Sequence, residues 1–172
     1  QGTSFGTLGQ QGGFMSTKIK GGLIWIMVFQ AVGFFLGKLT QQDIVSWYST
    51  LHKSSLTPPA IVFPIAWFIL YCMIALSGYS LWQYRHQPQA KKALAFYTPQ
   101  VILNWAWTPL FFYLHWIGAS LFCITLIILF TFITMLITRK HYKFSCAMLI
   151  PYFIWLVFAG YLNAMIWLLN AS

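Results

Sequence analysis

The chain has 172 residues, of which 59% are hydrophobic, 20% are aromatic and only 6% are charged. Soluble globular domains carry about 25% charged residues, so this composition excludes a soluble domain and is typical of an integral membrane protein. The formal net charge is +9, and Asp43 is the single acidic residue. This excludes catalysis by paired carboxylates, carboxylate metal sites and proton relays through buried Asp or Glu.

Long uncharged stretches predict the membrane spans, because about 20 apolar residues cross a bilayer as a helix. Such stretches cover 21–37, 54–84, 93–138 and 144–172. The third is long enough for two helices, with a turn at 115–118. The sequence therefore predicts an all-α integral membrane protein, a bundle of five transmembrane helices, with spans at about 22–38, 62–84, 94–114, 118–138 and 145–169.

Two segments lie outside these spans, and residues 22–170 are expected to form a single domain. Residues 1–21 are predicted to be a flexible N-terminal tail, of which 1–14, rich in Gly, Gln and Thr, are expected to be flexible or left over from cloning. The connection 39–61 is long and contains Trp47, Tyr48 and a Pro-Pro pair that stiffens the backbone. Two interpretations of it stay open: a lid over the bundle, or an aromatic pair at the level of the lipid headgroups.

The basic residues predict the topology. Only Lys38 and Lys53 lie on one side of the five spans, and the other eight lie on the opposite side. The positive-inside rule places the N-terminus in the cytoplasm of a cell inner membrane, with the C-terminus and the 39–61 connection outside. Topology and lipid headgroups account for the positive charge, so the expected partner is the lipid bilayer and no nucleic acid.

Conventional catalytic and metal-binding signals are missing from the sequence. The four histidines, His52, His86, His115 and His141, lie in or beside loops, which argues against haem ligation inside the membrane. The three cysteines lie far apart, and no phosphate loop or nucleophile motif is present. We expect no metal, no permanent cofactor and no conventional catalytic constellation.

The third predicted span carries an unusual polar and aromatic run, Asn104-Trp105-Ala106-Trp107-Thr108-Pro109. An unpaired polar group in hydrocarbon costs several kcal/mol, so a mid-span amide is expected to face the bundle interior or a ligand. Helical spacing places Asn104, Trp107 and Thr108 on one face and turns Trp105 elsewhere.

The fifth predicted span carries a similar stripe, formed by Trp155, Ala159 and Asn163. Two such stripes suit the walls of a pocket for a planar apolar ligand, because indoles stack on a π-face and an amide fixes orientation. The alternative is that Asn104 and Asn163 form interhelical hydrogen bonds among packed tryptophans. Both interpretations remain open at this point.

Four blocks of sequence carry a resemblance to a known family. They are Trp47-Tyr48 through Lys53 to Pro58-Pro59, Phe63-x-x-x-Trp67-x-x-x-Tyr71, the run from Tyr97 to Phe112, and Pro151-Tyr152-x-x-Trp155-x-x-Phe158-Ala159-x-x-Leu162-Asn163. In this order and spacing they closely resemble the TspO/translocator protein family, also called tryptophan-rich sensory proteins or peripheral-type benzodiazepine receptors. The resemblance implies a five-helix membrane bundle, often a homodimer. It also implies binding of tetrapyrroles such as protoporphyrin IX, and of isoquinoline carboxamide-type ligands, under the first loop.

Carried over by motif, the resemblance implies that the ligand contacts are Tyr48, Trp67, Asn104, Trp107, Trp155 and Ala159, to which the two stripes add Thr108 and Asn163. The expected function is a membrane receptor or sensor for tetrapyrroles. Light-dependent degradation of the bound porphyrin, attributed to some members, would use Trp67 or Trp155 as the redox residue. The alternative is a passive carrier, or a regulatory interaction protein without chemistry whose dimer forms through Gly33-x-x-x-Gly37 on the first span.

Overall fold

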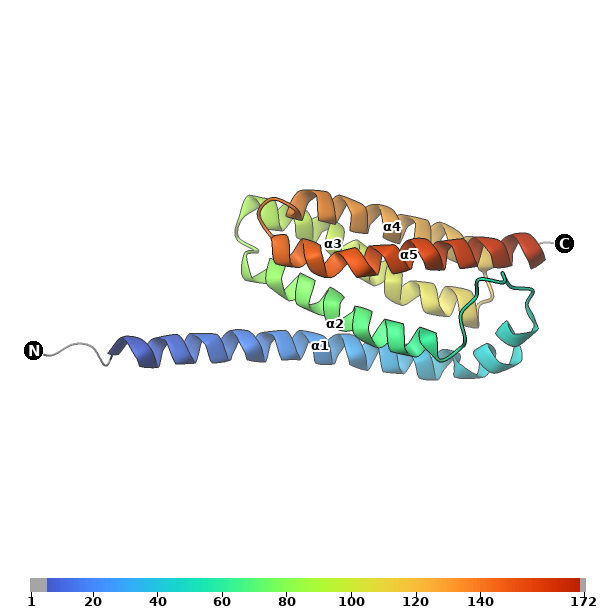
Figure 1. The fold of residues 1–172 in the computed structure, drawn as a ribbon, viewed down its shortest axis with the longest axis horizontal. Coiled ribbons are helices and arrows are strands. Elements are labelled where there is room, and N and C mark those ends of the chain that lie inside the picture. The colour runs from blue at the N-terminus through green and yellow to red at the C-terminus, as the bar shows by residue number, and fades with distance from the viewer. Residues whose placement is uncertain (1–5, 171–172) are drawn as a thin grey trace, which may run out of the picture.

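The computed structural model describes the backbone of residues 6–170 and the side chains of residues 18–170. Five long helices follow one another along the chain (Figure 1). They are α1 (Gly6–Ser46), α2 (Val62–Gln83), α3 (Pro88–Thr108), α4 (Ile117–Thr138) and α5 (Lys143–Asn170). The predicted all-α five-helix bundle is confirmed.

Four helices, α1, α2, α4 and α5, are long and apolar enough to cross a membrane, judged over the described part of the chain. Helix α3 is more polar than the others because it carries Lys91 and Lys92 near its start and Gln100 and Asn104 in its interior. Both interior amides are buried among the neighbouring helices. The low hydropathy of α3 therefore comes partly from exposed lysines at its start and partly from interior amides that face protein.

Helix α1 is much longer than the predicted span at 22–38. It runs from Gly6 to Ser46, so the tail expected over 1–21 is helical from Gly6 onward, and residues 1–5 lie outside the described part. Its N-terminal end projects beyond the bundle (Figure 1). Charged residues end a membrane span but do not end a helix, since an established helix gains one hydrogen bond for each residue added. For the same reason the connection between α1 and α2 covers 47–61, a shorter segment than the predicted 39–61.

The start of α3 also precedes its predicted position. The helix begins at Pro88, after Gln87 in an extended conformation, where the span was expected from about 94. Proline suits the first turn of a helix because its missing N–H has no intrahelical partner there. At its other end α3 passes into a π-helix, Pro109–Tyr113, which continues the predicted third segment almost to residue 114.

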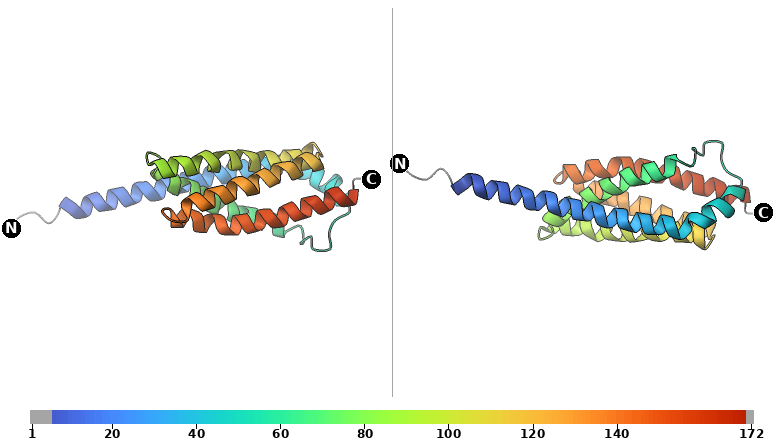
Figure 2. Two further views of the ribbon diagram at one scale, coloured as in Figure 1. Left: turned by 90° about the horizontal axis from the view of Figure 1, so that it is seen from above. Right: turned by 90° about the horizontal axis from the view of Figure 1, so that it is seen from below.

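The helices pack as a bundle in which α3 lies along α4, α4 along α5, and α2 against both α1 and α5 (Figure 2). The centre is filled by large buried side chains such as Ile74, Tyr152 and Leu156. At the end away from the 47–61 connection, the hydroxyls of Ser77 and Ser145 form a 2.7 Å hydrogen bond that joins α2 to α5. Paired hydroxyls of this kind let polar residues sit in a membrane bundle without the cost of an orphaned group.

Gly33 and Gly37, the pair predicted to form a dimer face, have different surroundings. A Cβ atom added to Gly33 would lie 2.6 Å from the ring of Tyr71, so this glycine permits close contact between α1 and α2 of the same chain. A Cβ atom on Gly37 would meet nothing within 4 Å. Gly33 therefore serves the fold of the single chain, and the homodimer face predicted from the motif loses one of its two small residues.

Candidate functional site

An aromatic cluster joins α2 to α5 below the 47–61 connection. The ring centroids of Trp67 and Trp155 lie 6.5 Å apart, edge to face at 86°. Tyr71 lies 5.6 Å from Trp67, and Phe63 and Phe158 lie 6.0 Å and 5.8 Å from Trp155. The four-residue spacing on α2 aligns its three rings on one helical face. We call these five residues the Trp67–Trp155 cluster.

The indole N–H of Trp155 is buried, and no hydrogen-bond partner is found for it within the described part of the chain. A buried donor without a partner costs about 1–3 kcal/mol, so such a group calls for an explanation. Ala159 lies one helical turn further along α5 and is partly buried against the core. The cluster thus combines flat apolar rings with one available donor.

The two indoles of the cluster contact each other in this conformation. Rings in edge-to-face contact at 6.5 Å leave no room for a third flat ring system between them. A planar ligand would therefore have to lie beside the pair or displace one ring. Either way the cluster offers a stacking surface and a donor, and its five residues include no carboxylate, imidazole or thiol.

The side-chain amide of Asn104, by contrast, is hydrogen-bonded to other side chains of the protein. Its Oδ1 accepts a 3.2 Å hydrogen bond from the Tyr71 hydroxyl, and its Nδ2 donates a 3.0 Å hydrogen bond to the Tyr152 hydroxyl. Tyr152 in turn donates to Gln100 Oε1 at 2.9 Å. This chain of hydrogen bonds joins α2, α3 and α5. We call these four residues the Asn104 network.

Asn163 is engaged in the same manner closer to the 47–61 connection. Its Oδ1 accepts hydrogen bonds from Trp107 Nε1 at 3.1 Å and from Ser120 Oγ at 3.0 Å, and its Nδ2 donates to the Ile117 carbonyl at 3.2 Å. These contacts join α3, α4 and α5. Thr108 is the last residue of α3, at the junction with the π-helix. The contacts of both asparagines fit the interhelical hydrogen-bond interpretation.

Tyr48 packs on the π-helix that follows α3. Its ring lies 6.1 Å from Phe111 and 5.4 Å from Phe112, edge to face in both cases. Lys53 Nζ lies 4.8 Å from the centre of the Tyr48 ring and donates hydrogen bonds to the carbonyls of Tyr48 and Leu51 at 2.8 Å and 2.9 Å. Burial raises the pKa of the Tyr48 phenol above its ordinary value of 10.0, so the phenol is neutral at physiological pH.

The remainder of the connection is attached to the C-terminal end of α5. The His52 amide donates to Asn170 Oδ1 at 3.0 Å, and Asn170 Nδ2 donates to the His52 carbonyl at 2.9 Å. The hydroxyls of Ser54 and Tyr161 share a 2.9 Å hydrogen bond. The connection therefore reaches α5 on its way from α1 to α2 (Figure 1), as a lid would.

A second attachment holds the end of α1 to the turn between α3 and α4. The His115 ring stacks on Trp47 at 4.0 Å and 18°, and its Nε2 lies 3.3 Å from Asp43 Oδ1. His115 has a φ of 57°, a left-handed conformation that is uncommon for a residue with a side chain. The sequence did not predict this contact, although Asp43, the single acidic residue of the chain, lay in the predicted 39–61 connection and was the signal for a specific partner.

The model of the TspO/MBR family matches residues 25–168, which include the whole of α2 to α4 and nearly all of α5. The chain belongs to the TspO/MBR family. It is therefore a multi-pass membrane protein, in agreement with its apolar helices.

Relatives in the TspO/MBR family carry related names. The chain is 35% identical to protein CrtK of Rhodobacter capsulatus over 126 residues, 73% of this chain and 79% of the relative. It is 34% identical to the tryptophan-rich protein TspO of Archaeoglobus fulgidus over 146 residues, 85% and 94% of the two chains. It is 30% identical to the human translocator protein over 140 residues, 80% and 83%.

In this TspO/MBR chain the predicted site residues fall into separate groups. Trp67, Trp155 and Ala159 lie in or beside the Trp67–Trp155 cluster. Asn104 belongs to the buried network below it, where Tyr71 is shared by both. The remaining residues lie towards the 47–61 connection, namely Tyr48, Trp107, Thr108 and Asn163.

Proposed function

We propose that the protein is a membrane receptor for tetrapyrroles such as protoporphyrin IX, which it binds at the Trp67–Trp155 cluster beneath the 47–61 connection. The observation that carries the proposal is the buried indole N–H of Trp155, unpaired among the described residues and set in a group of five aromatic rings. A porphyrin supplies the complement, since its flat face stacks on aromatic rings and its carboxylates accept hydrogen bonds. An isoquinoline carboxamide, planar with one carbonyl acceptor, would compete for the same features.

Access to the cluster requires the connection to move. Its contacts with α5 are exposed hydrogen bonds at His52 and Ser54, which are weak compared with buried apolar packing. The ligand then separates the edges of Trp67 and Trp155 or rotates one of them. We place this face on the non-cytoplasmic side of the cell inner membrane, because eight of the ten basic residues lie towards the opposite end of the bundle.

The two asparagines act indirectly in this proposal. Asn104 and Asn163 hold α3 against α5 through hydrogen bonds, and so keep the walls of the site in register. On the side of the connection, the edge of the site is formed by Tyr48, Trp107 and Thr108. A ligand that bonded to either asparagine would gain little binding free energy, because it would have to break a hydrogen bond that the asparagine already makes within the protein.

The contact between the two indoles bears on light-dependent chemistry. In this chemistry the light-excited porphyrin takes one electron from Trp67 or Trp155 and passes it to oxygen. The superoxide formed then adds to the macrocycle, the electron returns to the indole radical, and both oxygen atoms remain in the ring-opened product. A passive carrier would bind the ligand without this loss. Faster decay of porphyrin absorbance under illumination with oxygen than without it, reduced in Trp155→Phe, would support degradation, and identical decay in all samples would support the carrier.

A titration with a matched control tests the binding site. Purified full-length protein is titrated with protoporphyrin IX while porphyrin absorbance is followed. Trp155→Phe keeps an aromatic ring and removes the N–H, so affinity should fall about tenfold, the effect of one hydrogen bond of about 1.4 kcal/mol. Trp167→Phe removes an indole from an exposed position on the same helix and should bind as the wild type does. Equal affinity of Trp155→Phe and wild type would overturn the assignment.

A further inference from the structure

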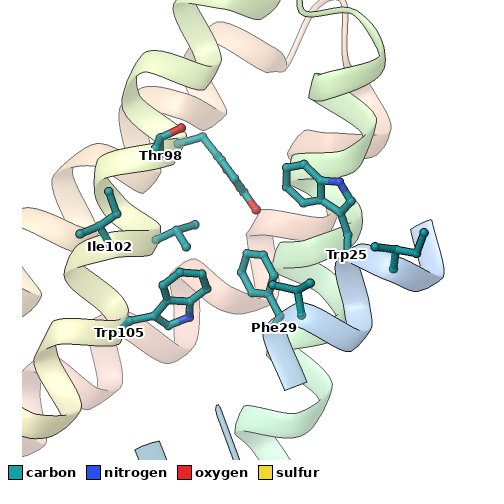
Figure 3. A pocket seen from close by; sticks show the side chains of 9 residues that line it. Trp25, Phe29, Thr98, Ile102 and Trp105 are labelled. Atoms are coloured by element: carbon teal, nitrogen blue, oxygen red, sulfur yellow. The ribbon is translucent and has the colours of Figure 1, made fainter. Parts of the chain in front are cut away.

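An apolar groove lies on the outside of the bundle, between α1 and α3 (Figure 3). It has a volume of 320 Å³, and its walls include Trp25 and Phe29 on α1 and Thr98, Ile102 and Trp105 on α3. Ile102 is 57% exposed, so the groove opens on the outer surface of the protein. None of the residues in the proposed tetrapyrrole site lines it. The groove is therefore a separate feature that the proposed function does not use.

The groove must be filled by something apolar when the protein is in a membrane. The hydrocarbon region contains no water to occupy it, which leaves a lipid chain or a helix of another protein. Helix interfaces in membranes are enriched in Gly, Ala, Ser and Thr, because small residues let two backbones approach closely. Of the nine residues that line the groove, Thr98 alone is of this kind, and the rest are Ile, Val, Phe, Tyr and Trp. Walls of this bulk suit a flexible acyl chain better than a second helix.

Two exposed lysines continue the groove towards the end of the bundle away from the 47–61 connection. Lys20 lies four residues before Ile24 on α1, about one helical turn, and Lys91 lies seven residues before Thr98 on α3, about two turns. These spacings place each lysine on the helical face that lines the groove. Helices α1 and α3 run in the same direction, so both lysines lie at the same end of it (Figure 1).

We propose that this groove is a binding site for an anionic phospholipid. Its acyl chain lies along Thr98, Ile102 and Trp105, and its phosphate lies between the ammonium groups of Lys20 and Lys91. Basic groups between transmembrane helices, on the side of the membrane rich in Lys and Arg, are suited to acidic lipid headgroups. The apolar wall alone would bind the acyl chain of any phospholipid. The two lysines at its end add a preference for lipids whose headgroup is negatively charged.

Lipid binding by the full-length protein tests the proposal. Protein in detergent is titrated with phosphatidylglycerol or phosphatidylcholine, and bound lipid is counted by native mass spectrometry. Each lysine near a membrane surface contributes about 1 kcal/mol to binding an acidic lipid, so the wild type should prefer phosphatidylglycerol by about 30-fold. The double variant Lys20→Gln/Lys91→Gln should lose this preference and keep its affinity for phosphatidylcholine. Ile102→Phe, which fills the groove, should weaken binding of both lipids.

A variant that removes two other lysines distinguishes lipid binding in the groove from general electrostatic attraction between the protein and acidic lipids. Lys92→Gln/Lys140→Gln removes two exposed lysines at the same end of the bundle, one of them adjacent to Lys91 but turned to another face of α3. This variant should keep the wild-type preference. The proposal is overturned if the control loses as much as the double variant or if the wild type binds both lipids equally. It is also overturned if Ile102→Cys chains cross-link to each other in the presence of phosphatidylglycerol, because a second copy then occupies the groove.

Discussion

The Asn104 network and the Trp67–Trp155 cluster lie side by side in the bundle, share Tyr71, and use their polar groups differently. In the network, three side-chain hydrogen bonds connect four residues from three helices. In the cluster, the indole donor of Trp155 is buried and unpaired among the described residues. Gln100 Nε2 of the network, Trp105 Nε1 and Thr131 Oγ1 are also buried without a partner in the described part of the chain. The comparison therefore teaches that an unpaired donor supports a ligand site only together with a surface that suits the ligand, which in the cluster is its flat apolar rings.

The largest effect is expected from breaking the network. Asn104→Ala removes one hydrogen bond from the Tyr71 hydroxyl and one from the Tyr152 hydroxyl, which keeps its bond to Gln100. The free energy of unfolding should fall by about 2 kcal/mol, because both hydroxyls are buried. Thermal unfolding in detergent measures this. Thr125→Ala is the control, because that hydroxyl bonds only to the Leu121 carbonyl in its own helix. If the two variants were equally stable, Asn104 would have no role in holding the helices together.

A smaller effect should follow from releasing the connection that covers the cluster. Asn170→Ala removes both hydrogen bonds to the His52 backbone, which are exposed, so the local cost should be about 1 kcal/mol and amide exchange in the connection about fivefold faster. Porphyrin association should accelerate as well. Ser49→Ala, whose hydroxyl bonds only to nearby carbonyls at the end of α1, should change neither rate. If amide exchange in the connection were unchanged in Asn170→Ala, the interpretation of the connection as a lid would be wrong.

The smallest effect concerns Tyr48. Its pKa is raised in the folded protein, so its contribution to stability is complete below pH 10, its ordinary value, and is lost as the pH rises through the folded value. Amide exchange in the 47–61 connection should therefore increase above pH 10 more steeply in the wild type than in Tyr48→Phe, after correction for the intrinsic rate. Identical profiles for the two proteins would show that ionisation of this phenol does not affect the docking of the connection.

The helix boundaries show where prediction from sequence worked and where it failed. Helices α2 and α4 begin and end within one residue of the predicted spans, because turns border both apolar stretches closely. Helices α1 and α3 extend well beyond theirs, because backbone hydrogen bonding continues past lysines that leave the membrane. Gaps between charges therefore predict how many helices there are and roughly where they lie, but they do not mark the ends of the helices.

The candidate site divides in the same way. Helical spacing in the sequence identified the faces of α3 and α5 that turn inward, including Asn104, Trp107 and Trp155. It also predicted that Trp105 points elsewhere, and in the structure this ring lies 5.3 Å from Phe29 on α1. It left open whether the asparagines faced a ligand or another helix. That choice depends on the tyrosines of α2 and α5, which lie 33 and 48 residues away from Asn104 in the sequence.

By itself, the sequence determined that this is a membrane protein, and it determined the number of helices, their inward faces and the family. These properties follow from composition, periodicity and local motifs. The tertiary structure alone decided which polar groups are paired. It joined Asn104 to two tyrosines, His115 to Asp43 and Asn170 to His52. Among the described residues it left four buried side-chain atoms without a partner, one of which is the indole nitrogen of Trp155. The physical reason is that hydrogen bonding depends on distances of about 3 Å between atoms, and packing brings such atoms together from helices far apart in the chain.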